Sequence, residues 1–372
     1  MSSQANLATD WRAGYGPIAH RSETIERMQA LVQRLVAQRR IADEASAHAL
    51  LAAADRVACT AMSVVAHMTY ARRIDRSGCP LGSDDFKQTP EGHTGGSLNM
   101  VPAFVGYLLA NALTGTTRGW LMGQGHCVAA IEAVNALTGD VSAAQRGRYD
   151  RSEAGLSLLI ADFYSYAIDK QGRPAVPLGS HAGPNTAGAI SEGGYLGFAG
   201  LQYVHTPLPG ESLVAFLSDG AFEEQRGSDW APRWWRAEDC GFAIPVMILN
   251  GRRIEQRTQI VQEGGATWLA EDLRHNGFDP VIVDGRDPMA IAWAIVEAED
   301  TLSAFAARSD RRYPVKLPYV IAETEKGFGF PGAATNAAHN LPLNGNPRED
   351  AQAREAFNAG AAALFVPESE LE

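Results

Sequence analysis

The sequence predicts an α/β fold in which a parallel sheet is covered by helices on both faces. Two observations carry this prediction: short apolar runs end in Gly, Asp or Asn, and helical stretches follow them. Strands that alternate with helices are typical of parallel sheets, because a crossover helix returns the chain to the same edge of the sheet. The expected strands are 213–217, 244–249, 281–283 and 319–322, and the clearest expected helices are 266–275 and 288–307.

Further helices are expected on both sides of this region. Apolar residues recur at helical spacing from Ile25, and the alanine-rich stretch 43–72 predicts a second helix. Several Gly and Pro residues predict a loop over 74–91. We therefore expect three parts along the chain: an N-terminal arm with helices over 1–84, an α/β domain over 85–345, and a C-terminal helix with a charged tail over 346–372.

The composition is that of a globular protein, and it limits the classes of partner. The 372 residues carry a formal net charge of −11, which argues against nucleic acid and against an anionic membrane as the main partner. The longest apolar stretch, 101–113, is interrupted by Pro102 and Gly106, so it predicts a buried helix rather than a membrane span. The four cysteines form no C-x-x-C pair and the N-terminus lacks a signal pattern, so we expect a cytoplasmic protein with free thiols.

Two of the expected strands end in residues that suit a metal-bound diphosphate. Asp219 and Gly220 follow the strand 213–217, and Asn250 follows the strand 244–249. Ligands of parallel sheets bind at the carboxyl ends of strands. Magnesium prefers oxygen ligands, which the Asp219 carboxylate, the Asn250 amide and a backbone carbonyl just beyond it can supply. Gly220 lets backbone N–H groups approach phosphate oxygens, although Asp-Gly and Asn-Gly pairs are also common in simple turns.

The stretch 211–257 resembles the thiamine-diphosphate signature of transketolases and phosphoketolases, which starts with Gly-Asp-Gly and ends near a downstream Asn. The resemblance implies thiamine diphosphate and Mg²⁺ as cofactors, with Asp219, Asn250 and the carbonyl of Arg252 as metal ligands. The residues that it implies in contact with the cofactor are Gly125, Gly193, Gly194, Ser218, Asp219, Gly220, Ala221 and Asn250. Ser218 replaces the first Gly of the signature, and Ala221 stands where phosphoketolases usually have Glu. These departures bear on the subfamily more than on cofactor binding, because Ser is small and retains its N–H group.

Four histidines lie in surroundings that resemble motifs of the same family. Their contexts are Gly92-His93-Thr94-Gly95-Gly96, Gly123-Gln124-Gly125-His126, Ser180-His181-Ala182-Gly183-Pro184 and Ala338-His339-Asn340-Leu341-Pro342. The resemblance implies that these four histidines line the channel over the thiazolium ring and act in catalysis. Imidazole suits this role because it binds hydroxyls and transfers protons near neutral pH. A zinc site is the alternative for three of them, but no closely spaced pair supports it.

The resemblance covers roughly 85–345, which corresponds to the first domain of these enzymes. Their second domain holds the aminopyrimidine ring and provides the glutamate that helps to activate the cofactor. We therefore expect a separate pyrimidine-domain subunit and an α2β2 heterotetramer with two-fold symmetry. Trp230, Trp234 and Trp235 are expected either at that contact or in the core.

The resemblance further implies an enzyme subunit that cleaves the C–C bond next to a ketone and transfers a two-carbon unit. The expected small-molecule substrate is a ketose phosphate or a related 2-keto compound. His181 and its glycine-rich sequel favour the phosphoketolase-like version, whereas Thr94, where phosphoketolases commonly have an aromatic residue, favours the transketolase-like one. Two alternatives stay open: a subunit that decarboxylates a 2-keto acid, as in pyruvate dehydrogenase, and a non-catalytic regulatory subunit.

Overall fold

The computed structural model describes residues 11–143, 145–172, 207–224, 235–254 and 256–371. The helices within these ranges are α2 (Ser22–Ala37), α3 (Glu44–Tyr70), α4 (Thr94–Thr114), α5 (Val128–Thr138), α6 (Glu153–Asp162), α8 (Asp219–Glu224), α10 (Gln259–Glu263), α11 (Ala266–His275), α12 (Pro288–Ala306) and α13 (Ala351–Ala363). The strands are β1 (Gly119–Met122), β2 (Ser212–Ser218), β3 (Phe242–Leu249), β4 (Arg252–Arg253), β5 (Gln256–Arg257), β6 (Phe278–Asp284) and β7 (Leu317–Glu323). Each helix and strand that the sequence predicts is present, and the additional elements are β1, β4, β5, α5, α6, α8 and α10.

Five parallel strands form the main sheet, in the order β1-β2-β3-β7-β6. The short strands β4 and β5 form an antiparallel pair directly after β3. In the main sheet, β2 and β3 are neighbours in register, so that Ser218 lies opposite Ile248. The predicted parallel α/β sheet is therefore confirmed, and the carboxyl ends of its strands lie along one edge.

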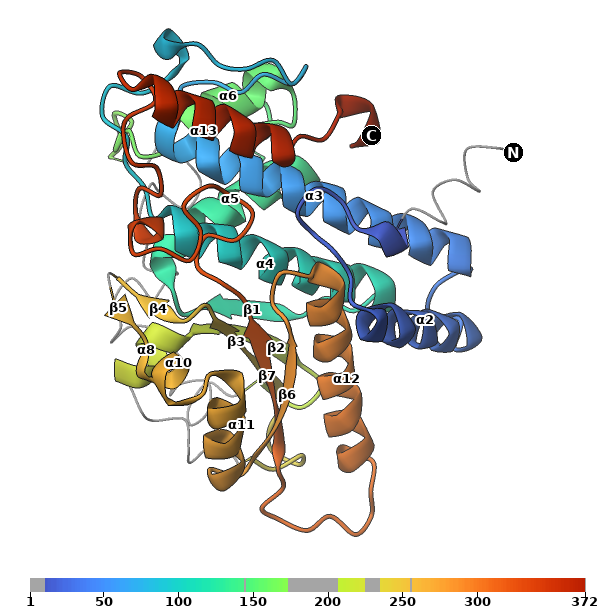
Figure 1. Cartoon of the computed structure of the whole chain (residues 1–372). Coiled ribbons are helices and arrows are strands. Elements are labelled where there is room, and N and C mark those ends of the chain that lie inside the picture. Colours follow the sequence, from blue (N-terminus) through green and yellow to red (C-terminus); the bar gives the residue numbers. More distant parts are fainter. Residues whose placement is uncertain (1–10, 144, 173–206, 225–234, 255, 372) are drawn as a thin grey trace.

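The central strands β3 and β7 are buried on both faces, and alternate residues enter two different hydrophobic clusters. In β3, Val246 and Ile248 pack into the larger cluster, whereas Met247 and Leu249 pack into the smaller one. Successive side chains of a strand point to opposite faces, so this alternation reflects one helical layer on each side of the sheet. Figure 1 shows α4 over one face, with α3 beyond it, and α11 over the other face.

The helix α4 is the central element of the larger layer, because α3, α5 and α12 all pack against it. By length and composition alone, α3 and α4 could each cross a membrane. The apolar 18-residue stretches of these two helices are, however, 78% and 83% buried inside the structure. A helix that is apolar on all sides and enclosed by other helices is a core helix of a large domain, so the prediction of a buried helix over 101–113 is confirmed.

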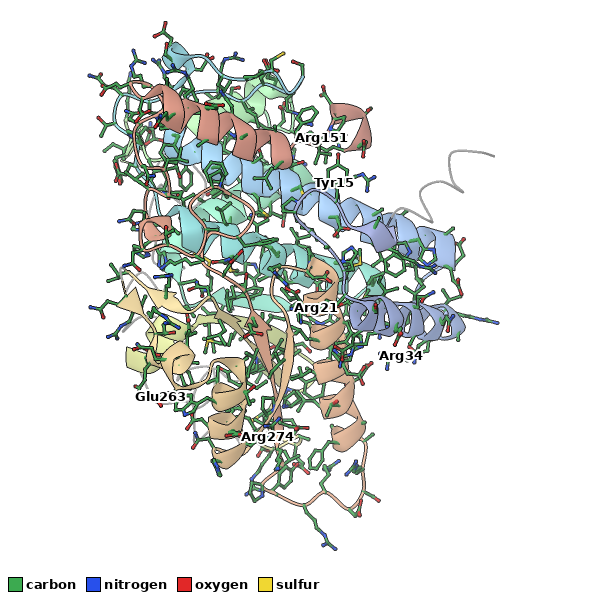
Figure 2. All side chains as sticks on the ribbon, in the orientation of Figure 1. Tyr15, Arg21, Arg34, Arg151, Glu263 and Arg274 are labelled. Carbon is green, nitrogen blue, oxygen red and sulfur yellow. The ribbon has the colours of Figure 1, made fainter. Side chains whose placement is uncertain are left out.

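The N-terminal segment is fixed to the helical layer by a buried histidine between two carboxylates. His20 Nε2 lies 3.0 Å from Asp55 on α3, and Nδ1 lies 3.0 Å from Asp287, which caps the N-terminus of α12. The angle at Nδ1 is poor for a hydrogen bond, so the second contact is an ion pair. Burial by itself lowers the pKa of His20, but the two carboxylates outweigh burial and raise it to about 10. Arg21, labelled in Figure 2, pairs with Asp284 at the end of β6.

One hydrophobic cluster joins the three parts of the chain that the sequence predicts. Trp11, Phe216 and Val366 come from the N-terminal, α/β and C-terminal parts, and all three are buried in the larger cluster. Trp235 belongs to the smaller cluster and donates a hydrogen bond from Nε1 to the carbonyl of Gly241 at 3.0 Å. Of the two roles expected for this tryptophan, the structure therefore shows core packing.

Candidate active site

Four neighbouring strands end at the same edge of the sheet, and a functional side chain follows each one. His126 follows β1, Asp219 follows β2, Asn250 follows β3 and Lys326 follows β7. Residues that follow adjacent parallel strands converge, and this edge is where such sheets bind their ligands. His93, which directly precedes α4, joins the group from the helical layer.

Asp219 is fully buried, and its carboxylate connects the ends of β2 and β3. Its Oδ1 accepts a hydrogen bond from the backbone N–H of Gly220 at 3.1 Å. Its Oδ2 accepts from the N–H of Gly251 at 2.7 Å and from the Thr258 hydroxyl at 3.3 Å. Burial raises the pKa of Asp219 to about 7, although these hydrogen bonds and the Lys326 charge oppose the rise. A carboxylate in such a place is stabilised by contact with a cation.

Asn250 lies beside Asp219, because the next residue, Gly251, donates to the carboxylate. The Asn250 side-chain oxygen accepts a hydrogen bond from the backbone N–H of Arg252 at 3.1 Å, which closes the turn after β3. A Cβ atom on Gly220 would lie only 2.8 Å from Cβ of Arg253, so glycine is needed for this turn to approach β2. The acid, the amide and the Arg252 turn thus meet at two adjacent strand ends.

The donors at these strand ends fit a magnesium diphosphate. A carboxylate, an amide oxygen and a backbone carbonyl are the oxygen ligands that Mg²⁺ prefers. Zinc sites instead use nitrogen and sulfur ligands around one ion. Within the described ranges, no group of three or more His, Cys, Asp or Glu side chains could hold a metal ion, so the three described histidines form no zinc site.

Three of the predicted catalytic histidines lie together in a triangle. The ring centroids of His93 and His126 are 5.4 Å apart, those of His93 and His339 are 5.6 Å apart, and those of His126 and His339 are 5.7 Å apart. The three residues come from the start of α4, the end of β1 and the segment after β7. The backbone N–H of His93 donates to the hydroxyl of Tyr164 at 3.1 Å, which fixes the turn before α4. Residues more than 240 positions apart therefore form one imidazole cluster.

Two glycines in the first turn of α4 allow this cluster to form. A Cβ atom on Gly96 would lie 3.0 Å from Nε2 of His126 and 2.9 Å from Sγ of Cys127. A Cβ atom on Gly95 would lie 2.2 Å from the carbonyl oxygen of Ala338. Any larger residue would push away one of the two segments that carry His126 and His339. The Gly95-Gly96 pair is thus a packing requirement of the site.

Lys326 completes the site, and the sequence analysis did not predict it. Its side chain is 3% exposed, and Nζ lies 2.9 Å from Nδ1 of His339. Burial lowers the pKa of Lys326, and the nearby Asp219 charge opposes this effect. Burial also lowers the pKa of His339, which the charges of Lys326 and His93 reduce further, to about 4. The lysine therefore lies between the Asp219 edge of the sheet and the imidazole cluster.

A compositional signal could have indicated Lys326. The chain has 32 basic residues, of which only four are lysines: Lys87, Lys170, Lys316 and Lys326. Arginine thus supplies nearly every positive charge. A lysine in such a sequence indicates a position whose chemistry arginine does not suit. An amine can lose its proton when buried, whereas a guanidinium stays charged.

The structure describes only some of the remaining predicted site residues. Ser218 is the last residue of β2, and Gly125 begins the turn that carries His126. His181, Gly193 and Gly194 lie outside the described residues, as do Trp230 and Trp234. Ala221 lies in α8, where only its backbone is described.

Comparison with known proteins places the chain in a family. The sequence profile described as XFP N-terminal domain matches residues 46–359. A probable phosphoketolase of Streptomyces coelicolor is 32% identical over 197 residues, which are 46% of this chain and 24% of that protein. A probable phosphoketolase of Mycolicibacterium paratuberculosis is 28% identical over 319 residues, which are 78% of this chain and 38% of that protein. The matched part thus spans about a quarter to two fifths of the length of these relatives.

Solved structures with a similar arrangement include two transketolases. A transketolase variant from Pichia stipitis aligns over 84% of this chain and 44% of its own, with 17% identity and a TM-score of 0.46. The transketolase from Leishmania mexicana aligns with 16% identity and a TM-score of 0.43. The assignment rests on the sequence profile, which matches most of the chain. Three of the four predicted histidine motifs lie within the matched range at residues that the structure describes. The chain therefore belongs to the XFP N-terminal domain family, the phosphoketolase N-terminal domain of the thiamine-diphosphate-dependent transketolase and phosphoketolase superfamily.

Proposed function

We propose that this chain is the diphosphate-binding half of an enzyme that cleaves the C–C bond next to a ketone and transfers the two-carbon unit. One observation carries the proposal. Three imidazoles and a buried lysine lie together beside a buried acid and an amide at the carboxyl edge of the sheet. This combination serves two tasks, because it can hold an anionic cofactor and move protons next to it.

The cofactors that suit the edge of the sheet are Mg²⁺ and thiamine diphosphate. Asp219, Asn250 and the carbonyl of Arg252 would hold the metal ion, and the N–H of Gly220 would face the diphosphate. When bound, thiamine diphosphate supplies the carbanion and the electron sink that C–C cleavage requires. The chain itself binds the charged end, provides a buried environment and positions the groups that exchange protons.

His339 has a defined protonation state in this arrangement. Its lowered pKa of about 4 makes the ring neutral at pH 7. Lys326 donates a hydrogen bond to Nδ1, so the neutral ring carries its proton on Nε2. That N–H can donate to a substrate hydroxyl or to a developing oxyanion. His93 and His126 face the same space and supply the further proton carriers.

A ketose phosphate is the substrate class that we propose, with a phosphoketolase-like outcome. In that outcome a ketose phosphate and inorganic phosphate would give acetyl phosphate, an aldose phosphate shorter by two carbons, and water. The match to the phosphoketolase N-terminal domain supports this version over the transketolase-like one. Supplying a ketose phosphate with inorganic phosphate or with an acceptor aldehyde, and measuring acetyl phosphate or the new ketose, separates the two.

We also propose that a separate subunit carries the pyrimidine-binding domain, in an α2β2 assembly. In support, the matched region covers at most 38% of the length of the two curated relatives named above. Mixing the chain with a candidate pyrimidine-domain protein is expected to give a complex of four subunits in light scattering. Full activity of the 372-residue chain by itself would contradict this proposal.

The proposed function is tested first by cofactor binding. Calorimetric titration of the chain with thiamine diphosphate is expected to show binding that requires Mg²⁺. The same titration is repeated in the presence of the pyrimidine-domain subunit, which is expected to increase the affinity. If neither titration shows binding, the non-catalytic alternative replaces the enzyme.

The variant Lys326→Met is expected to raise the pKa of His339 and to slow turnover by at least roughly 100-fold. Removal of the amine eliminates the positive charge that lies 2.9 Å from Nδ1 and the donor that fixes the tautomer. Histidine NMR titration, with His339 assigned by its loss in His339→Gln, measures the first effect. Lys326→Arg keeps the charge and is expected to leave the pKa of His339 low. An unchanged His339 titration in Lys326→Met would show that the pair does not interact.

A further inference from the structure

The position of Lys326 is not set by a helix or a strand. Lys326 lies in the turn that follows β7, three residues beyond the last residue of that strand. The turn has one internal backbone hydrogen bond to Lys326, in which the N–H of Ala334 donates to the Lys326 carbonyl at 2.8 Å. A side chain that must lie accurately between Asp219 and His339 therefore starts from an irregular segment, which needs support from elsewhere.

That support comes from Asn99, in the second turn of α4. Its Nδ2 donates to the carbonyl of Glu325 at 2.7 Å and to the Thr324 hydroxyl at 3.3 Å. Its Oδ1 accepts from the backbone N–H of Gly327 at 3.3 Å. The amide thus binds the turn on both sides of Lys326 and uses its two donors and its acceptor on three residues of the stretch 324–327.

The rest of the same helix face is shaped for this contact. Gly95 lies one turn before Asn99, and a Cβ atom there would lie 3.0 Å from Cγ of Lys326. Gly327 has a φ of +81°, a conformation that favours glycine and that turns its N–H toward Asn99. Small residues bring the turn close to α4, and the amide then fixes it.

Asn99 is otherwise out of place in α4. It is 1% exposed, and its neighbours in the helix, Leu98, Met100 and Val101, are fully buried apolar residues. A buried amide is costly unless its hydrogen bonds are made. All three of its hydrogen bonds go to the Lys326 turn, so packing of α4 alone gives no reason for an amide at this position.

We propose that Asn99 is a positioning residue that holds Lys326 between Asp219 and His339. It acts through the turn and not by contact with the reacting atoms. The inference rests on the proposed function for its importance to turnover, whereas the placement of Lys326 next to His339 can be measured on the isolated chain.

The test is histidine NMR titration of Asn99→Ala. Release of the turn is expected to move Lys326 away from His339, so that the pKa of His339 rises toward its ordinary value of about 6.5. We expect this rise in the pKa of His339 to be at least half of the rise in Lys326→Met, the variant that removes the amine altogether. The matched control is Val101→Ala, which removes buried volume from the same helix and is expected to lower thermal stability without moving the His339 titration.

Asn99→Asp provides a second variant that decides the question if the alanine variant does not fold. The carboxyl group keeps an acceptor for Gly327 but cannot make both of the donor hydrogen bonds, so an intermediate rise in the pKa of His339 is expected. If Asn99→Ala and Asn99→Asp leave this titration unchanged, Asn99 is a structural amide and the inference is overturned. Calorimetry with thiamine diphosphate and Mg²⁺ on the same proteins separates this result from failure of the proposed function. Absence of cofactor binding in the wild type would contradict the proposed function, whereas the result of the His339 titration would remain valid.

Discussion

Asp219→Asn is expected to weaken magnesium-dependent binding of thiamine diphosphate by at least roughly 100-fold. The estimate is a lower bound, because loss of an outer partner of a metal ligand already costs 10- to 100-fold in affinity. The substitution keeps the shape of the side chain and one acceptor oxygen but removes the negative charge at the junction of β2 and β3. Calorimetric titration with the cofactor, with and without Mg²⁺, measures the effect.

The same variant should fold at least as well as the wild type. Burial raises the pKa of Asp219 to about 7, above its unfolded value, so the stability linked to its protonation is present at low pH and is lost as pH rises toward 7. A neutral amide avoids this loss, so Asp219→Asn is expected to match or exceed the unfolding free energy of the metal-free wild type at pH 8. The matched control is Asp284→Asn, at the end of β6 and paired with Arg21, which should leave cofactor affinity unchanged. Normal cofactor affinity in Asp219→Asn would count directly against the proposed metal site.

His20→Ala is expected to cause the largest loss of stability, about 3–5 kcal/mol at pH 7. The imidazole lies between the carboxylates of Asp55 and Asp287, and all three side chains are at most 1% exposed. Removal of the positive partner leaves two acids buried near each other and releases the N-terminal segment from α3 and α12. Urea unfolding at equilibrium measures the change. His275→Ala removes an exposed histidine at the end of α11 and serves as the control, with an expected change below about 0.5 kcal/mol.

The pH dependence gives an independent check of this ion cluster. The folded-state pKa of His20, about 10, lies above its unfolded value, so its contribution is fully present below pH 6.5 and is lost as pH rises through 10. The difference in unfolding free energy between wild type and His20→Ala should therefore shrink between pH 7 and pH 10. Asp55 and Asp287 titrate differently in the two proteins, because they lose their positive partner in His20→Ala, whereas the remaining titrating groups are shared and largely cancel. A difference that stays constant across this range would show that His20 is uncharged in the folded protein.

The sequence predicted the sheet, and the position of Asp219 and Asn250 at one edge of it, because these signals are local. Asp219 and Asn250 each follow a short apolar run, and parallel strands bring such residues together at one edge without further information. The histidines His93, His126 and His339 were recognised by motif, and the structure adds that their rings form one cluster. That proximity depends on packing between α4, β1 and the segment after β7, which no local pattern reports.

The features that sequence reasoning missed share a physical cause. β1 has only four residues and contains a glycine, so its pattern is too short to separate from a loop. Lys326 stands between turn residues with no motif around it, and its contact with His339 shows where it lies in the site. Asn99 is an isolated amide within an apolar helix, and its hydrogen-bond partners lie in a turn more than 220 residues later. Such long-range hydrogen bonds become visible only in three dimensions.

The helix α4 connects the candidate site with a remote part of the protein. Its N-terminal end carries His93, Gly95 and Asn99, and its last turn, about 30 Å away at 1.5 Å per residue, ends in Thr114. There Arg40 binds the carbonyl of Thr114, and Arg118 binds its hydroxyl. The two arginines thereby anchor the C-terminal end of a helix whose other end carries residues of the candidate site. We therefore expect substitutions at Arg40 to act on α4 from the protein surface, without altering any residue of the candidate site.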